Sequence, residues 1–239
     1  MDAGWLPRTH FNTDGSRFDS AGQTRGVSCY VLTMTLHIVD HPLLHDIMTR
    51  LRNRETSSDD YRALTYRVST FLIAEATRDL PTREVPVSTP LEETTGRRID
   101  TRVVAVPVLR AGIGMLQAFV DLVPGTEVGY FGLERDEETA VARCYYEKVP
   151  KDLGGAVVYL LDPMLATGGS AAMAVEGLLA RGAHDVRLVA IVAAPEGVEL
   201  LSQRTNGTKI YTAALDRGLN ERKYILPGLG DFGDRLYGT

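Results

Sequence analysis

Residues 156–182, AVVYLLDPMLATGGSAAMAVEGLLARG, contain three pieces with different residue patterns. Residues 156–161 form a short, uninterrupted apolar run, which is typical of a strand buried on both faces of a parallel sheet. Residues 171–181 place apolar side chains at helical spacing, and Gly182 is a natural stop. The side chains that we expect this helix to bury are Met173, Val175, Leu178 and Leu179. A buried strand followed by a helix after a short loop favours an α/β fold.

The nine residues between this strand and this helix carry the groups that a phosphate site needs. Gly168 and Gly169 can adopt backbone angles closed to other residues, so consecutive N–H groups can converge on one point. Thr167 and Ser170 add hydroxyls, and the helix start adds the positive end of its dipole. Asp162, at the carboxyl end of the strand, can accept hydrogen bonds from the two hydroxyls of a ribose.

A plain strand-to-helix turn is the alternative interpretation, in which the glycines only permit the bend and Ser170 only caps the helix. The acid at the strand end, followed by glycines at this offset, favours ligand binding instead. A Walker-type loop is excluded because no lysine follows the glycines, and the Gly-x-Gly-x-x-Gly dinucleotide spacing is also absent here.

The run Asp162, Pro163, Met164, Leu165, Ala166, Thr167, Gly168, Gly169, Ser170 resembles the phosphoribosyl-pyrophosphate (PRPP) loop of the uracil phosphoribosyltransferases, a branch of the type I phosphoribosyltransferases. The wider family usually has two adjacent acids at the start of this loop, and Pro163 in the second place is the variation of the uracil branch. The resemblance extends over most of the chain after residue 36. It implies that all nine residues bind PRPP, with Asp162 orienting the ribose.

A second strand-to-helix turn, which carries a cation, follows the apolar run at residues 102–109. The guanidinium of Arg110 stands at a glycine-bearing strand-to-helix turn, where it is well placed to hold a phosphate group with two hydrogen bonds. An arginine that pairs with a surface acid is the alternative. Because Leu-Arg-Ala-Gly supplies a pyrophosphate contact in the uracil enzymes, the resemblance implies that role for Arg110.

Residues 128–133 are predicted to form a strand, and residues 134–150, which are charged and then aromatic, are interpreted as a β-hairpin flap over the active site. The family pattern Arg-x-Glu-Glu-Thr matches at Arg135, Glu137, Glu138 and Thr139. The match implies that Arg135 is a second PRPP ligand, whereas the acids are interpreted as solvated charges of the flap. Lys148 is within reach of a phosphate in such a hairpin, but nothing in the sequence decides it.

The C-terminal stretch 216–235 contains too many glycines to predict a regular element. Its glycines would let backbone N–H and C=O groups approach a flat polar ring edge to edge. A disordered end is the alternative, and the apolar and aromatic residues in the stretch disfavour it. The stretch resembles the uracil-binding segment of the family, Tyr-Ile-x-Pro-Gly-x-Gly-Asp-x-Gly-Asp. The resemblance implies base contacts from Tyr224, Ile225, Gly230, Asp231 and Phe232, with Asp231 also facing PRPP. Phe232 replaces the alanine common in bacterial members.

The bulk composition bounds the class of protein. The chain has 239 residues, of which 44% are hydrophobic and 24% charged, as is ordinary for a soluble protein with one α/β domain. The net charge of −5 gives no reason to expect a nucleic-acid or anionic-membrane partner. Cys29 and Cys144 lack metal-ligand spacing, no apolar run approaches a membrane span, and no signal sequence precedes the domain. We therefore expect a cytoplasmic protein.

The predicted fold is a mostly parallel twisted sheet flanked by helices, with an N-terminal helical arm and the β-hairpin flap. Residues 1–29 are predicted to be an extension, and residues 30–239 a single phosphoribosyltransferase domain. Two amphipathic helices, near residues 42–51 and 59–72, would form the arm or a dimer-forming subdomain. Other expected elements are a loop or small hairpin at 82–100, strands at 186–193 and 209–215, and a short helix at 196–203.

The resemblance implies a uracil phosphoribosyltransferase, which converts uracil and PRPP into UMP and pyrophosphate in pyrimidine salvage. Arg110, Arg135 and Asp231 are the expected catalytic residues, and Mg²⁺ is expected to bind through PRPP instead of through protein side chains. A homodimer or homotetramer, and GTP as an activator, are further expectations from the resemblance. The rival hypotheses are a transferase for another nucleobase and a non-catalytic regulator that binds UMP, PRPP or RNA.

Overall fold

The computed structural model describes residues 35–135, 142–205 and 207–239. Leu32–Thr239 constitutes one compact unit. The predicted extension at residues 1–29 lies outside the described residues, as do the tip of the predicted flap and its residues Glu137, Glu138 and Thr139. Within the described part of the chain, no helix is long and apolar enough to span a membrane.

A nine-stranded sheet forms the centre of the described residues, with the order β1-β11-β10-β8-β4-β6-β7 and two short strands, β5 beside β4 and β9 beside β10. Every pair in it is parallel except β6–β7, which is antiparallel. The strands are β1 (Thr35–Ile38), β4 (Arg102–Leu109), β5 (Glu127–Val128), β6 (Tyr130–Arg135), β7 (Ala142–Lys148), β8 (Ala156–Leu161), β9 (Met164–Leu165), β10 (Asp185–Ala193) and β11 (Lys209–Leu215). The predicted mostly parallel α/β sheet is confirmed.

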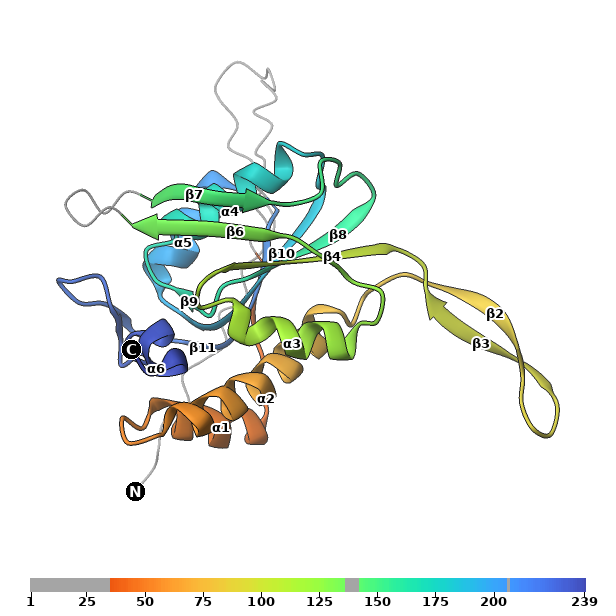
Figure 1. The fold of residues 1–239 in the computed structure, drawn as a ribbon, viewed down its shortest axis with the longest axis horizontal. Helices are drawn as coiled ribbons and strands as arrows, with labels where there is room; N and C mark the ends of the chain where they lie inside the picture. The colour runs from red at the N-terminus through yellow and green to blue at the C-terminus, as the bar shows by residue number, and fades with distance from the viewer. Residues whose placement is uncertain (1–34, 136–141, 206) are drawn as a thin grey trace, which may run out of the picture. The chain divides into compact units, whose positions relative to one another are not determined.

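Helices cover both faces of this sheet (Figure 1). One face carries α1 (Pro42–Arg52), α2 (Ser58–Ala76) and α3 (Ile113–Leu122), and the other carries α4 (Gly169–Leu179) and α5 (Pro195–Arg204). Alternate side chains of β8 enter the two cores, with Val157 and Tyr159 on the α2 face and Val158 and Leu160 on the α4 face. A strand buried on both faces therefore needs the unbroken apolar run that the sequence shows.

The two N-terminal helices are part of the core and do not form the predicted arm. Each begins at a side-chain cap, since His41 Nδ1 accepts from Leu43 N at 3.1 Å and Ser57 Oγ accepts from Asp60 N at 3.1 Å. Their apolar faces are buried in the same cluster as β8, with α2 packed against β10 and β11 and α1 packed against α2. The prediction of an arm was wrong because a sequence pattern shows that a helix has an apolar face, not which element covers it.

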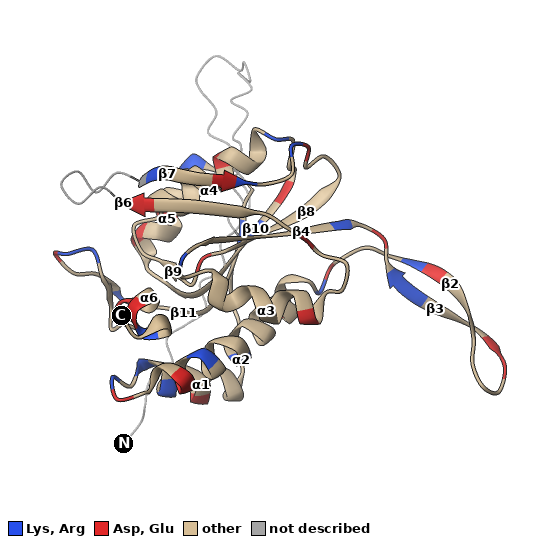
Figure 2. Cartoon of the chain, viewed as in Figure 1, with Lys and Arg blue, Asp and Glu red and all other residues tan. Residues whose placement is uncertain are grey.

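The element that extends from the sheet is instead the hairpin of β2 (Thr82–Ser88) and β3 (Glu93–Ile99), which projects beyond α3 (Figure 1). This confirms the hairpin that was one of two alternatives for residues 82–100. Its side chains are exposed almost throughout, and acidic and basic residues are interspersed along both strands (Figure 2).

Some predicted buried positions are exposed. Leu179 is 37% exposed and Leu43 is 57% exposed, although both stand at helical spacing with buried neighbours. Each lies in the first or last turn of its helix. Met173 is only partly buried, whereas Val175 and Leu178 are fully buried as predicted.

The glycine-rich tail contains regular elements, contrary to the prediction. They are the two-stranded ladder of β12 (Gly218–Leu219) and β13 (Ile225–Leu226), and α6 (Phe232–Tyr237). The Asp231 side chain caps α6 by accepting from Asp234 N at 2.9 Å. One glycine, Gly233, lies inside this short helix, which tertiary packing of Phe232 and Leu236 stabilises despite its poor propensity.

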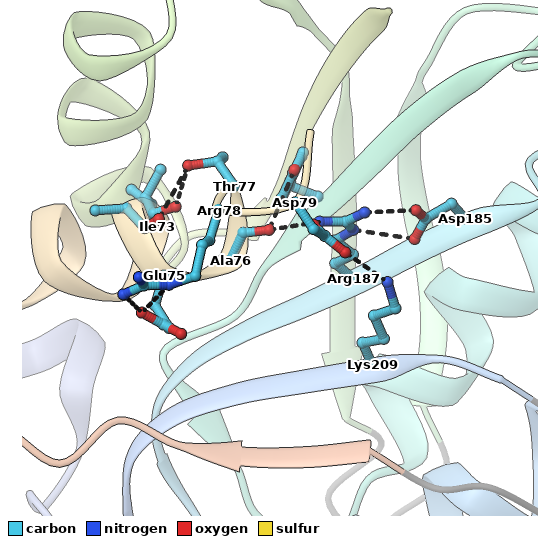
Figure 3. A network of polar contacts seen from close by, with 11 residues as sticks. Ile73, Glu75, Ala76, Thr77, Arg78, Asp79, Asp185, Arg187 and Lys209 are labelled. Atoms are coloured by element: carbon cyan, nitrogen blue, oxygen red, sulfur yellow. Dashed lines mark hydrogen bonds and ion pairs between the residues drawn. The ribbon is translucent and has the colours of Figure 1, made fainter. Parts of the chain in front are cut away.

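A polar network lies at the amino end of the sheet (Figure 3). Arg187 in β10 is 3% exposed at its side chain, donates to Asp185 at 2.7 Å and to Ala76 O at 2.6 Å, and also pairs with Asp79. Its guanidinium lies 5.6 Å from the ring centroid of Tyr159. This network fastens the C-terminal end of α2 to the sheet, on the edge opposite the ends of β4 and β8 where ligands are expected.

Candidate active site

A cavity of about 440 Å³ opens at the carboxyl ends of β4 and β8. Four segments line most of it: residues 108–111 after β4, residues 164–168 after β8, residues 222–225 in the β12–β13 hairpin and residues 230–233 at the start of α6. Asp162, Ser170, Ala171 and Leu133 complete the lining. The tertiary structure therefore joins the predicted phosphate loop, the predicted pyrophosphate turn and the predicted base segment around one space.

Backbone hydrogen bonds fix the loop after β8 to the neighbouring strand β10. Asp162 N donates to Val189 O at 3.2 Å, and Pro163 O accepts from Ile191 N at 3.0 Å and from Val192 N at 3.1 Å. Met164 N in turn donates to Asp162 Oδ1 at 3.3 Å. These bonds hold the main chain of the loop on the sheet. Asp162 lines the cavity, whereas Pro163 is buried and does not line it.

Gly168 makes the sharp turn into α4 with a φ of +82° and serves as its N-cap without a side-chain cap. The alternative role of Ser170 as the helix cap is therefore wrong, and its residue lines the cavity one position inside the helix. The first N–H groups of α4 start at this wall, next to Thr167. Unpaired amides with the positive end of a helix dipole are the groups that bind phosphate.

Arg110 also lines the cavity, at the end of β4. Its Nη2 lies 3.8 Å from Asp234 Oδ1, with both side chains more than half exposed. An exposed pair at this distance contributes about 0–1 kcal/mol, so a phosphate can replace the carboxylate at little cost. Gly112 brings this turn against β8, because a Cβ there would lie 2.3 Å from Leu161 O. Tyr237 donates its hydroxyl to Arg110 O at 3.1 Å, and burial raises its pKa against the opposing effect of Arg110.

The base segment is closed into a loop by a buried ion pair. Arg52, at the end of α1, donates to both oxygens of Asp216, at 2.9 Å and 2.7 Å. The same guanidinium donates to Gly228 O at 2.9 Å, and Gly228 N donates to Asp216 Oδ2 at 2.8 Å. Since the Asp216 side chain is only 5% exposed, this cluster rigidly fixes the two ends of residues 216–228.

A second arginine fixes the end of the same segment. Arg235 donates to Leu51 O at 2.6 Å and to Leu229 O at 2.9 Å. Its guanidinium lies 4.4 Å from the ring centroid of Tyr61, which is fully buried. Burial raises the pKa of Tyr61, so its hydroxyl stays neutral beneath the site.

The side chain of Phe232 points into the core. It is buried, and its ring centroid lies 5.2 Å from that of Tyr61 in an edge-to-face arrangement. Contact of residue 232 with a base therefore falls to its main chain. Asp231, immediately before it, lines the cavity while its Oδ1 accepts from Asp234 N.

Comparison with known proteins identifies the family. The model of the family described as uracil phosphoribosyltransferase matches residues 38–239. The chain belongs to the uracil phosphoribosyltransferase family. A protein named uracil phosphoribosyltransferase from Streptomyces avermitilis is 50% identical over 209 residues, covering 86% of this chain and 99% of the relative. One from Levilactobacillus brevis is 45% identical over 203 residues, covering 84% and 97% respectively. A solved structure of an Aquifex aeolicus protein superposes with a TM-score of 0.82 at 34% identity, covering 86% of this chain and 99% of that one.

Two residues that the resemblance to the uracil phosphoribosyltransferases assigns to PRPP, Pro163 and Gly169, do not line the cavity. A third, Arg135, ends β6, and its side chain lies outside the described part of the chain. Lys148, which the sequence left undecided, does not line it either. The remaining predicted site residues do line it. Their roles remain predictions.

The sequence analysis missed two cations that line the cavity, Arg222 and Lys223. Their signal was present, since two basic residues stand directly before Tyr224 in the base segment. Two arginines that fix the base segment were also missed. Arg52 pairs with Asp216, 164 residues away along the chain, and Arg235 donates to Leu51 O, 184 residues away.

Proposed function

We propose that this chain transfers the phosphoribosyl group of PRPP to N1 of uracil, giving UMP and pyrophosphate. The observation that supports it best is the single cavity that joins the loop after β8, the Arg110 turn and the segment before α6. A sugar phosphate, a leaving pyrophosphate and a pyrimidine each meet a wall of suitable chemistry there. In this role the chain acts in pyrimidine salvage, as members of its family do.

The 5′-phosphate of PRPP would bind the start of α4. The amides at Gly168 and Gly169 and the hydroxyls of Thr167 and Ser170 supply donors, and the helix dipole favours the negative charge. Asp162 also lines the cavity, and we assign its carboxylate the role of accepting from the ribose hydroxyls. This places C1 of the ribose between the Arg110 turn and the base segment.

The reaction is a substitution at C1 of the ribose. The bond from C1 to the pyrophosphate oxygen breaks, a bond from C1 to N1 of uracil forms, and the proton on N1 is lost. Positive charge builds on the ribose and negative charge on the leaving group, so positioning and charge stabilisation are the main needs. Arg110 neutralises the leaving group, and we assign the same role to Arg135 on the flap. No covalent nucleophile is required.

Asp231 is the acid closest to the proposed base site. Capping of α6 holds its carboxylate in one orientation at the cavity wall. There it can orient a metal-bound water or favour loss of the N1 proton of uracil. A carboxylate is a weak base for uracil, so the positive charge that develops on the ribose contributes to the same step.

Mg²⁺ is part of this proposal, held by the oxygens of PRPP. Among the described residues no three His, Cys, Asp or Glu side chains cluster as a metal site. The carboxylates of Asp162 and Asp231 line the cavity and are the groups that would meet the waters of such an ion. When bound, Mg²⁺ neutralises charge on the leaving pyrophosphate.

Assembly and regulation complete the proposal. We infer a homodimer or homotetramer, which the exposed apolar side chains of the β2–β3 hairpin support, Val87 near the end of β2 and Leu91 in the turn. GTP as an activator is carried over from the resemblance alone, and a cytoplasmic location from the composition of the sequence.

Incubation with Mg²⁺, PRPP and each of uracil, cytosine, adenine and hypoxanthine tests the proposal, with nucleotide product separated by chromatography. Product with uracil alone is expected, and product with a purine would overturn the assignment. UMP binding without turnover would identify a nucleotide-binding regulator instead. Arg110→Gln should abolish most turnover. The matched control is Arg102→Gln at the amino end of the same strand, where the arginine pairs with Glu127 away from the cavity.

A further inference from the structure

The loop joining β12 to β13 is a tight, fully hydrogen-bonded turn. Lys223 N donates to Asn220 O at 2.9 Å, which closes a four-residue turn, and Asn220 N donates to Tyr224 O at 2.9 Å. The Asn220 side chain also accepts from Tyr224 N at 2.9 Å. Such an arrangement, a turn followed by one residue in the left-handed region, is a known hairpin connection.

The left-handed position of this turn is occupied by Lys223, with a φ of +65°. Among the described residues it is the only non-glycine with a positive φ. Glycine suits this place in the turn because a side chain crowds the backbone there. A lysine held in a strained conformation at a cavity points to a use for its side chain.

Lys223 lines the proposed active-site cavity together with Arg222. Its hairpin is tied to the helix behind the phosphate loop, because Leu219 N donates to Glu196 Oε1 at 3.0 Å in the first turn of α5. The next residue of α5, Gly197, packs directly against the phosphate loop, since a Cβ on it would lie 2.4 Å from Ala166 O.

The charged side chains that line the cavity leave the proposed phosphate loop without a cation of its own. The acids that line it are Asp162, at the ribose end, and Asp231, which caps α6. Arg110, which also lines the cavity, already has an acid beside it, since its Nη2 lies 3.8 Å from Asp234 Oδ1. The loop at the start of α4 contributes amides and hydroxyls but no charged side chain, so a dianionic phosphate there would have no formal countercharge from its own loop.

We propose that Lys223 is a ligand of the 5′-phosphate shared by PRPP and UMP, reaching from the β12–β13 hairpin over the loop at residues 166–170. This rests on the proposed function of the same cavity. A flexible four-carbon stem that ends in a compact ammonium suits a phosphate that must be released with the product. The residue thereby contributes to affinity for substrate and product, not to the departure of pyrophosphate.

The test exploits the backbone strain. Lys223→Gly removes the ammonium while giving the turn its preferred residue, so Tm should stay unchanged or rise. The KM for PRPP and the Kd for UMP should each rise about three- to tenfold, between the effect of a solvent-exposed ion pair and that of a buried hydrogen bond to a charged group. Lys223→Arg should keep both constants within about twofold. Lys151→Gly, at an exposed lysine outside the cavity, is the matched control.

The outcomes separate this inference from the proposed function. Unchanged KM and Kd in Lys223→Gly, in an enzyme that forms UMP, would overturn the role of Lys223 and leave the function intact. A change confined to inhibition by pyrophosphate would also overturn it, because that ligand lacks the 5′-phosphate. If the native chain forms no UMP, the proposed function fails, and calorimetry with UMP still tests the lysine.

Discussion

Gly168 and Gly197 face each other behind the proposed phosphate loop with no room for a side chain between them. A Cβ on Gly168 would lie 2.6 Å from Gly197 O, and a Cβ on Gly197 would lie 2.4 Å from Ala166 O. The loop and the first turn of α5 are therefore in backbone contact. The position of the loop depends on a helix that follows it by almost thirty residues in the sequence.

Gly197→Ala should displace the loop without touching any ligand. The contacting atoms belong to the backbone, so either the loop or α5 must shift, and we expect a loss of about 1–3 kcal/mol in stability. The KM for PRPP should rise more than the KM for uracil. Steady-state kinetics and thermal unfolding check this. Gly169→Ala is the control for stability, since a Cβ there would meet only Thr167 Oγ1 at 3.9 Å. Equal effects on both KM values would contradict the prediction.

Arg52→Gln should disconnect the base segment. Among the described residues, Gly228 N then remains as the donor to the buried Asp216 side chain, and loss of one partner from a buried pair costs about 3–5 kcal/mol. Because the ends of residues 216–228 then separate, the KM for uracil should rise while the KM for PRPP changes less. Arg50→Gln, on the same helix and exposed, is the matched control. A variant that merely unfolds earlier, with native KM values, would show that the clamp is only structural.

Asp231→Asn should separate catalysis from folding. Asparagine caps a helix about as well as aspartate, so α6 should persist and Tm should change little. If the carboxylate acts on uracil or on metal-bound water, kcat should fall about 10²-fold or more. Circular dichroism and product assays measure the two quantities. Native kcat with a lowered Tm would make the residue purely structural.

Stability should fall in acid through Asp79. Partial burial opposes ionisation, but hydrogen bonds from Arg187 and Lys209 prevail and hold the pKa of Asp79 below its usual value of 3.8. A carboxyl with a lowered pKa in the folded state stabilises the protein above pH 3.8, and this contribution is lost as the pH falls through the lower, folded-state value.

Denaturant unfolding at a series of pH values checks this expectation. Asp79→Asn should destabilise the protein at pH 7 and flatten the loss of stability below about pH 4. Kinetic constants should not change, because this network lies at the amino end of the sheet. A variant whose acid unfolding matches the native curve would show that other carboxyls dominate.

Local patterns predicted much of this fold. The strands at residues 156–161 and 209–215 coincide with β8 and β11, because unbroken apolar runs bounded by turn residues have few other stable environments. The phosphate loop was equally visible, since its glycines, hydroxyls and acid are contiguous. Amphipathic helices were found for the same reason, although not their place on the sheet.

What the sequence by itself determined is the order of strands and helices and the chemistry carried by each loop. Only the tertiary structure decided which distant residues are in contact: Arg52 with Asp216, Gly168 with Gly197, and Tyr61 with Phe232. It also decided that Lys223 occupies a left-handed turn at the cavity. The physical reason is that backbone geometry and side-chain periodicity are local, whereas burial and close packing join residues far apart in the chain.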